Sequence, residues 1–186
     1  MILFVYSKYL LIFFSIVDEC KELKSTIATV INEQKGITEY EKLYNKAVTI
    51  LHPYDSDFIC LLIILFNELQ VNKSIQLKIG KLIMKNYEMN LPQYHNTKGI
   101  MAINLTNVCH ALALSEIKNN KLSKAEELFN EAKIHITNAE NILEVSRGDA
   151  HPIMELCKTL KENIESETNI LQHRKENYSN LALSLF

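Results

Sequence analysis

Apolar residues recur at every third or fourth position through most of this chain, and that spacing constrains its fold more than any other feature. The spacing is clearest in residues 97–117 and again in residues 122–145, which are separated by the turn Asn119-Asn120. The apolar residues that would share one face of the first segment are Met101, Leu105, Val108 and Leu112. Side chains three and four residues apart lie on the same face of a helix. The sequence therefore predicts two long amphipathic helices joined as an antiparallel hairpin.

The same period predicts helices on both sides of this hairpin, at residues 18–32, 40–51, 57–69, 74–89 and 152–167. The 186-residue chain holds only 4 glycines and 3 prolines, the residues on which all-β proteins depend for their turns. Ala113, Ala125 and Ala132 provide small side chains where two helices of a hairpin would cross closely. We predict an all-α fold of antiparallel helix hairpins stacked as a tetratricopeptide-like solenoid.

Helix ends can be predicted at several places. Asp55 or Ser56 is expected to cap the helix at 57–69, and Ser123 with Glu126 forms a capping-box pattern. In the segment 146–152, Gly148 suits the position after a helix end and Pro152 suits the first turn of a new helix.

We expect one helical domain over residues 18–167, followed by a loosely ordered C-terminal tail at residues 168–186. Residues 1–17 form a separate hydrophobic segment, MILFVYSKYLLIFFSIV, which is shorter than a membrane span and contains Lys8. No small-residue cleavage pattern follows it. A buried helix or the remnant of a longer chain is the favoured interpretation, and a signal or anchor segment is the alternative.

Charge and cysteine content limit the partners that we expect. The formal net charge is -2 and acidic residues alternate with basic ones, so no nucleic-acid contact is expected. The cysteines are Cys20, Cys60, Cys109 and Cys157, with no C-x-x-C pair. Reduced, buried thiols favour a cytoplasmic or nuclear location, and membrane association is not expected.

No catalytic residue, metal ligand or cofactor is predicted. His135 has no second histidine four residues away, so the H-E-x-x-H pattern of zinc proteases is absent. His110 lies among apolar residues and is interpreted as a core histidine. Asp149 and His151 could form an acid–base pair, but a role in ending and capping helices is favoured because no nucleophile accompanies them.

Four polar residues of the hairpin are candidates for peptide binding: Lys98, Asn104, Asn107 and Lys133. The first three lie on the first helix of the hairpin and the last on its partner. Tetratricopeptide modules that hold the carboxy-terminal peptides of chaperones use lysine and asparagine to bind a carboxylate. The alternative is that these residues are ordinary solvated polar side chains, because spacing alone does not show that they converge.

With these residues in view, the chain resembles the C-terminal helical domain of the SET and MYND domain-containing lysine methyltransferases. The best stretch runs from Ile142 to Pro152, where a helix ending in Glu-Val precedes a glycine turn and then Asp-Ala-His-Pro. Leu91-Pro92-Gln93-Tyr94-His95, before the hairpin, is also similar to the family's order. The resemblance covers roughly residues 21–165. The stretch between Ala125 and His151 is about two helical turns longer than in the family.

The catalytic parts of that family are missing from this chain. Its zinc-binding MYND module needs a dense Cys/His cluster, and its SET domain needs a glycine motif and a catalytic tyrosine, neither of which is found. The resemblance implies a protein-interaction module that contacts a protein or peptide, such as a chaperone tail or a methylation substrate. The alternative is a fragment of an active S-adenosylmethionine-dependent protein-lysine methyltransferase whose SET domain lies upstream. A third hypothesis is a secreted or membrane-anchored helical protein.

Overall fold

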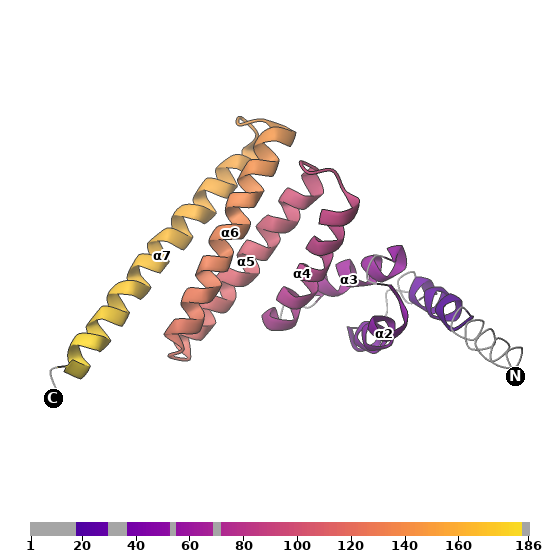
Figure 1. Ribbon diagram of the computed structural model, residues 1–186, viewed down its shortest axis with the longest axis horizontal. Coiled ribbons are helices and arrows are strands. Elements are labelled where there is room, and N and C mark those ends of the chain that lie inside the picture. Colours follow the sequence, from indigo (N-terminus) through magenta and orange to yellow (C-terminus); the bar gives the residue numbers. More distant parts are fainter. Residues whose placement is uncertain (1–17, 30–36, 53–54, 69–71, 184–186) are drawn as a thin grey trace, which may run out of the picture. The chain divides into compact units, whose positions relative to one another are not determined.

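The computed structural model describes residues 18–29, 37–52, 55–68 and 72–183, and all regular structure in these residues is helical (Figure 1). This confirms the predicted all-α class. The hydrophobic segment 1–17 lies outside the described residues. The chain divides into two compact units, residues 1–70 and 71–186, whereas the sequence predicts one domain over residues 18–167. Each unit is described by itself below.

The first unit contains a helix at residues 18–29, α2 (Ile37–Ile50) and α3 (Ser56–Glu68). The helix at 18–29 buries Leu23 and Ile27, which are four residues apart and so share one face. The buried apolar residues of α2, α3 and their connection are Leu43, Ala47, Leu51, Phe58, Ile59, Leu61, Leu62, Leu65 and Phe66. Helix α3 is therefore buried around most of its circumference, as its continuous apolar sequence predicts.

Asp55 determines where α3 begins. Its Oδ1 accepts hydrogen bonds from the backbone N–H groups of Asp57 and Phe58, at 3.0 and 3.4 Å. These bonds satisfy N–H groups that have no partner inside the helix, as the predicted cap requires. The other oxygen, Oδ2, lies 2.5 Å from Lys24 Nζ. One carboxylate thus starts α3 and connects it to the helix at 18–29.

The second unit contains α4 (Lys73–Asn90), α5 (Asn96–Lys118), α6 (Leu122–Arg147) and α7 (Pro152–Leu183). Each helix packs against the next in sequence, with the most extensive contact between α5 and α6. Figure 1 shows α5, α6 and α7 side by side, joined by short connections at alternating ends. The segments 97–117 and 122–145, predicted as a hairpin, match α5 and α6 to within two residues at each end.

Helix α5 packs on α4 and on α6, and this position explains its composition. Among the described helices, it is the one long and apolar enough to cross a membrane. Its buried apolar residues include Met101, Leu105 and Val108. A helix covered by protein on two sides has the same apolar character as a membrane span.

Small residues allow α5 and α6 to approach closely. Ala113, Ala125 and Ala132 are fully buried, as predicted for a helix crossing. Gly99 of α5 lies against Leu143 of α6, where a Cβ atom would come within 2.5 Å of the leucine Cγ. At this point only a glycine lets the two helices pack as they do.

Helix α7 is longer than the sequence analysis predicts. The predicted end near Glu167 is wrong, because the helix continues to Leu183. Ile164, Thr168 and Leu171 are all buried, and their spacing of four and three residues keeps them on one face. Lys175 pairs with Glu126 of α6. The second half of α7 therefore continues the packing surface of the first half.

Candidate functional site

A groove of about 680 Å³ opens on the second unit. It is lined by α4, the connection between α4 and α5, the first turns of α5 and the second half of α6. The lining residues are Met84, Glu88, Gln93, Tyr94, Lys98, Ala102, Ile134, His135, Asn138, Asn141, Ile142, Glu144 and Val145. A concave site with mixed apolar and polar walls is the usual form of a ligand site.

Lys98 is the most unusual residue of this groove. It is only 8% exposed, and lysine is almost never buried unless it is paired. Within the described part of the chain, no carboxylate or hydrogen-bond acceptor pairs with its ammonium group, and the nitrogen itself remains accessible to solvent. Lys98 also lies in the first turn of α5, where the helix dipole favours an anion rather than a cation. An anion bound in the groove would pair with this ammonium and would also interact favourably with the first turn of α5.

The other predicted peptide-binding residues do not line this groove. Asn104 is half-buried, Asn107 is exposed and Lys133 is half-buried, and none of them is among the lining residues. Asn104 and Asn107 are six and nine positions after Lys98, which at about 100° per residue places them on other faces of α5. Ala102, four positions after Lys98, shares its face and lines the groove.

Polar groups from α6 accompany Lys98 in the groove. Asn138 and Asn141 are exposed amides that can both donate and accept hydrogen bonds. Ile134 and Val145, 61% and 64% exposed, present apolar surface beside them. Large apolar side chains this exposed on a groove are typical of an interaction site.

Two carboxylates, Glu88 and Glu144, also line the groove. The groove therefore has mixed charge, with one lysine and two exposed glutamates. A ligand that carries several negative charges would be repelled by these carboxylates. A ligand with one carboxylate and adjacent apolar groups fits the lining better.

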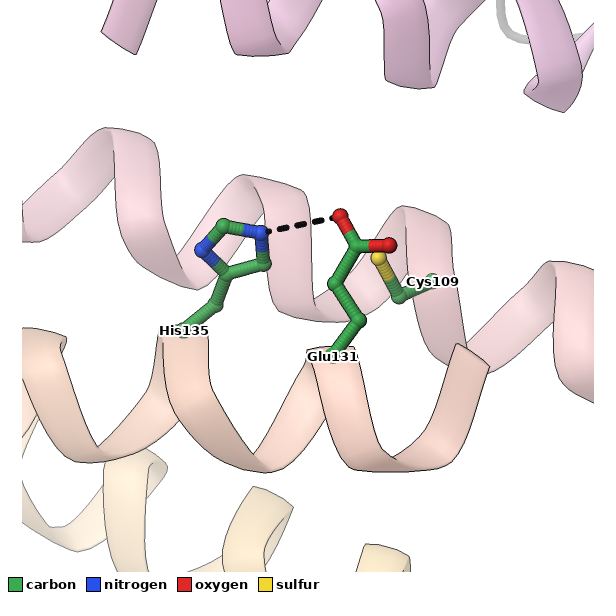
Figure 2. Close-up of side chains that lie close together, drawn as sticks. All are labelled: Cys109, Glu131 and His135. Carbon is green, nitrogen blue, oxygen red and sulfur yellow. Dashed lines mark hydrogen bonds and ion pairs between the residues drawn. The ribbon is translucent and has the colours of Figure 1, made fainter. Parts of the chain in front are cut away.

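A second group of side chains lies where α5 meets α6. Cys109 comes from α5, and Glu131 and His135 come from one face of α6 because they are four residues apart. One potential ligand atom of each residue lies within 4.8 Å of those of the other two. Figure 2 shows the Glu131 carboxylate between the His135 ring and the Cys109 sulfur. His135 also lines the groove, so this cluster borders it.

An ion pair with Lys81 and a hydrogen bond with His135 hold the Glu131 carboxylate in place. Its Oε1 lies 2.6 Å from Lys81 Nζ of α4 and 3.4 Å from His135 Nε2. Burial lowers the pKa of His135, although the hydrogen bond and charge of Glu131 oppose this effect. Burial raises the pKa of the Cys109 thiol to about 12, and the charge of Glu131 adds to the rise. At neutral pH the cluster thus combines a neutral imidazole and a protonated thiol beside Glu131.

This cluster is not predicted from the sequence. The zinc-protease pattern needs a second histidine four residues from His135, whereas the residue at that spacing is the carboxylate Glu131. That i,i+4 pair was the only signal available in the sequence. The third member, Cys109, is 22 positions before Glu131, and its place depends on how α5 and α6 are aligned.

The remaining histidines of interest have structural roles. His151 Nδ1 accepts a hydrogen bond from the backbone N–H of Ile153 at 3.2 Å, at the start of α7. This confirms capping as its role. His95 does the same for Thr97 at the start of α5, at 3.3 Å. His110 packs beside the Phe129 ring, with centroids 6.0 Å apart.

A scan against models of protein families finds no match to this chain, and a search of curated proteins finds none either. The resemblance to the SET and MYND family accordingly rests on the residues of the sequence alone, and the groove and the cluster are interpreted below from their own chemistry.

Proposed function

We propose that this chain is a protein-interaction module that binds a peptide carboxylate in the groove around Lys98. The observation that carries the proposal is a largely buried lysine, Lys98, that lines the groove and has no anionic partner among the described residues. A bound carboxylate would supply the missing partner.

The rest of the groove indicates what kind of peptide would fit. Asn138 and Asn141 can hydrogen-bond the backbone or the carboxylate of an extended peptide. Ile134 and Val145 can contact an apolar side chain near its end. Glu88 and Glu144 disfavour a strongly acidic sequence. We therefore propose a single terminal carboxylate preceded by an aliphatic residue as the preferred feature.

The packing of α4 to α7 supports a tetratricopeptide-like interpretation of the second unit. Successive helices contact their neighbours in sequence order, and small residues stand at the crossing of α5 and α6. We propose this arrangement as a short repeat array, in which each hairpin buries its face on the next. A relationship to the C-terminal module of SET and MYND methyltransferases is part of the same proposal. The proposed peptide site in the groove does not depend on this relationship.

The experiment measures the binding of fluorescein-labelled peptides that end in an aliphatic residue with a free carboxylate. One of these peptides is the tail of a cytosolic chaperone. Each peptide is paired with its C-terminal amide. We expect Lys98→Met to weaken binding of the free-carboxylate peptide about 10- to 100-fold, because a charge-assisted hydrogen bond contributes roughly 1.5–3 kcal/mol. Lys133→Met, which removes a half-buried lysine outside the groove lining, should leave binding unchanged.

The stability of Lys98→Met separates loss of binding from loss of fold. Because the substitution keeps an apolar stem and removes a cation from the first turn of α5, thermal melting should occur at the same temperature or higher. Equal affinity for the acid and the amide would contradict the proposal, and so would a Lys98→Met variant that binds normally.

A further inference from the structure

We propose that Cys109, Glu131 and His135 form a three-ligand site for a Zn²⁺ ion at the junction of α5 and α6. The ligands would be Cys109 Sγ, a Glu131 carboxylate oxygen and a ring nitrogen of His135. This inference is independent of the peptide proposal, since it concerns different side chains except for the position of His135 on the groove wall.

The geometry of the cluster is close to what a zinc ion needs. Zn–S and Zn–N bonds of about 2.3 and 2.0 Å with tetrahedral angles separate two ligand atoms by about 3.5 Å. The three atoms already lie within 4.8 Å of one another. Two of the ligands are held on adjacent turns of α6, and the third projects from the helix that packs most extensively against it. Small side-chain rotations would complete the site.

The chemistry of the three ligands selects the metal. A thiolate, an imidazole and a carboxylate together form a ligand set of intermediate softness, which suits Zn²⁺ and not the oxygen-seeking Mg²⁺ or Ca²⁺. Binding would replace the proton of the Cys109 thiol with a Zn–S bond and release that proton to solvent. The imidazole and the carboxylate need lose no proton to bind.

The burial of the cluster argues against an accidental arrangement of surface acids. Cys109 is 0% exposed, and the Glu131 and His135 side chains are 26% and 16% exposed. Within the described part of the chain, the Cys109 thiol makes no hydrogen bond, although it faces a carboxylate. A metal ion between them would give the thiol sulfur a partner.

Lys81 is the cation that pairs with Glu131 in this structure. Its Nζ contacts the same Glu131 oxygen as His135, and its side chain is 50% exposed. A half-exposed lysine can move into solvent at little cost, so it does not block a divalent ion. With three protein ligands, a fourth zinc position stays open to water or to a ligand in the groove that His135 lines.

The test titrates the purified full chain with Zn²⁺, and with Co²⁺ as its spectroscopic substitute. We expect one ion per chain, a rise in melting temperature with Zn²⁺, and the near-ultraviolet charge-transfer band of a cobalt–thiolate bond. Cys109→Ala should abolish the band and weaken Zn²⁺ binding at least tenfold. His135→Gln should weaken binding at least tenfold and keep the band, which provides a second variant if Cys109→Ala fails to fold.

Cys157→Ala is the matched control, because Cys157 is also fully buried but belongs to no group of potential ligands among the described residues. It should retain both the band and the affinity. A chain that binds no stoichiometric Zn²⁺ would overturn the proposal. A cobalt–thiolate band that survives Cys109→Ala would do the same, since the thiolate would then belong to another cysteine.

Discussion

Lys98 and Gly99 are neighbours in the first turn of α5, and each is buried for a different reason. Lys98 directs its charged group to the groove and packs its aliphatic stem against the protein. Gly99 has no side chain because Leu143 of α6 occupies the space where one would lie. Of these two adjacent residues, Lys98 is thus available for binding, whereas Gly99 allows the helices to pack.

Gly99→Ala should destabilise the second unit. Alanine is favoured over glycine in a helix by about 1 kcal/mol, but the added Cβ would come within 2.5 Å of Leu143 Cγ. Overpacking costs about 1–3 kcal/mol, and Leu143 is fully buried, so it has little room to move. We expect a net loss of roughly 1 kcal/mol in the free energy of unfolding, measured by urea denaturation followed by circular dichroism.

A double-mutant cycle identifies the cause of that loss. Leu143→Ala alone should cost about 2–5 kcal/mol because it leaves a cavity. Since the same substitution removes the atoms that the new Cβ would meet, the double variant should be more stable than the sum of the two single effects predicts. Additive effects, or a Gly99→Ala variant that gains stability, would disprove the steric explanation.

At the scale of helices, the sequence predicts the interior of each element better than its ends. The period of apolar residues places α4, α5 and α6 to within two residues, because burial on one face determines that period. The predicted cap by Ser123 and Glu126 is wrong: α6 begins at Leu122 without a side-chain cap, and Glu126 pairs with Lys175 instead. A side chain in a capping pattern can instead bind a residue that is distant in the sequence, and the local sequence does not show that partner.

The candidate site shows the same limit. Lys98 could be identified because it lies on the predicted hairpin, but its burial depends on α4 and α6 around it. Cys109 could not be assigned to Glu131 and His135, because their proximity depends on the register between two helices. Residue identity gives the available chemistry, whereas packing determines which groups meet.

Asp55 allows a test at the level of one element. Asp55→Ala removes the cap of α3 and should cost about 1–2 kcal/mol, whereas Asp55→Asn keeps an acceptor for the backbone N–H groups and should cost less. The thermal midpoint of each variant, followed by helical circular dichroism, provides the measurement. If Asp55→Asn is as damaging as Asp55→Ala, the pairing with Lys24 is more important than the cap.

The charge of Asp55 also predicts a pH dependence of the first unit. Burial alone would raise its pKa, but the Lys24 hydrogen bond and charge and the two backbone N–H groups together lower it below its ordinary 3.8. A carboxyl with a lowered pKa stabilises the fold fully above its unfolded pKa, and that contribution is lost as the pH falls through the folded value. Below about pH 4, the free energy of unfolding of Asp55→Asn should therefore vary less with pH than that of the unsubstituted chain.

At the scale of the whole molecule, both proposed sites belong to the second unit. Lys98, Cys109, Glu131 and His135 lie between residues 71 and 186, as do all residues that line the groove. This unit also has its own core, in which Phe129, Ile136 and Leu143 are fully buried. Folding and binding should therefore both be properties of this part of the chain.

A fragment of residues 71–186 should fold alone, with a cooperative thermal transition and with the same affinities for peptide and Zn²⁺ as the full chain. A shorter fragment, 71–151, provides the control because it lacks α7, which packs on α6 and buries Met154, Cys157, Ile164 and Leu171. Burial of each large apolar side chain contributes about 1.5–3 kcal/mol, so the shorter fragment should melt at a clearly lower temperature or stay unfolded. If residues 71–186 remain unfolded while the full chain folds, residues 1–70 are needed to complete the core, and the two units form one cooperative structure.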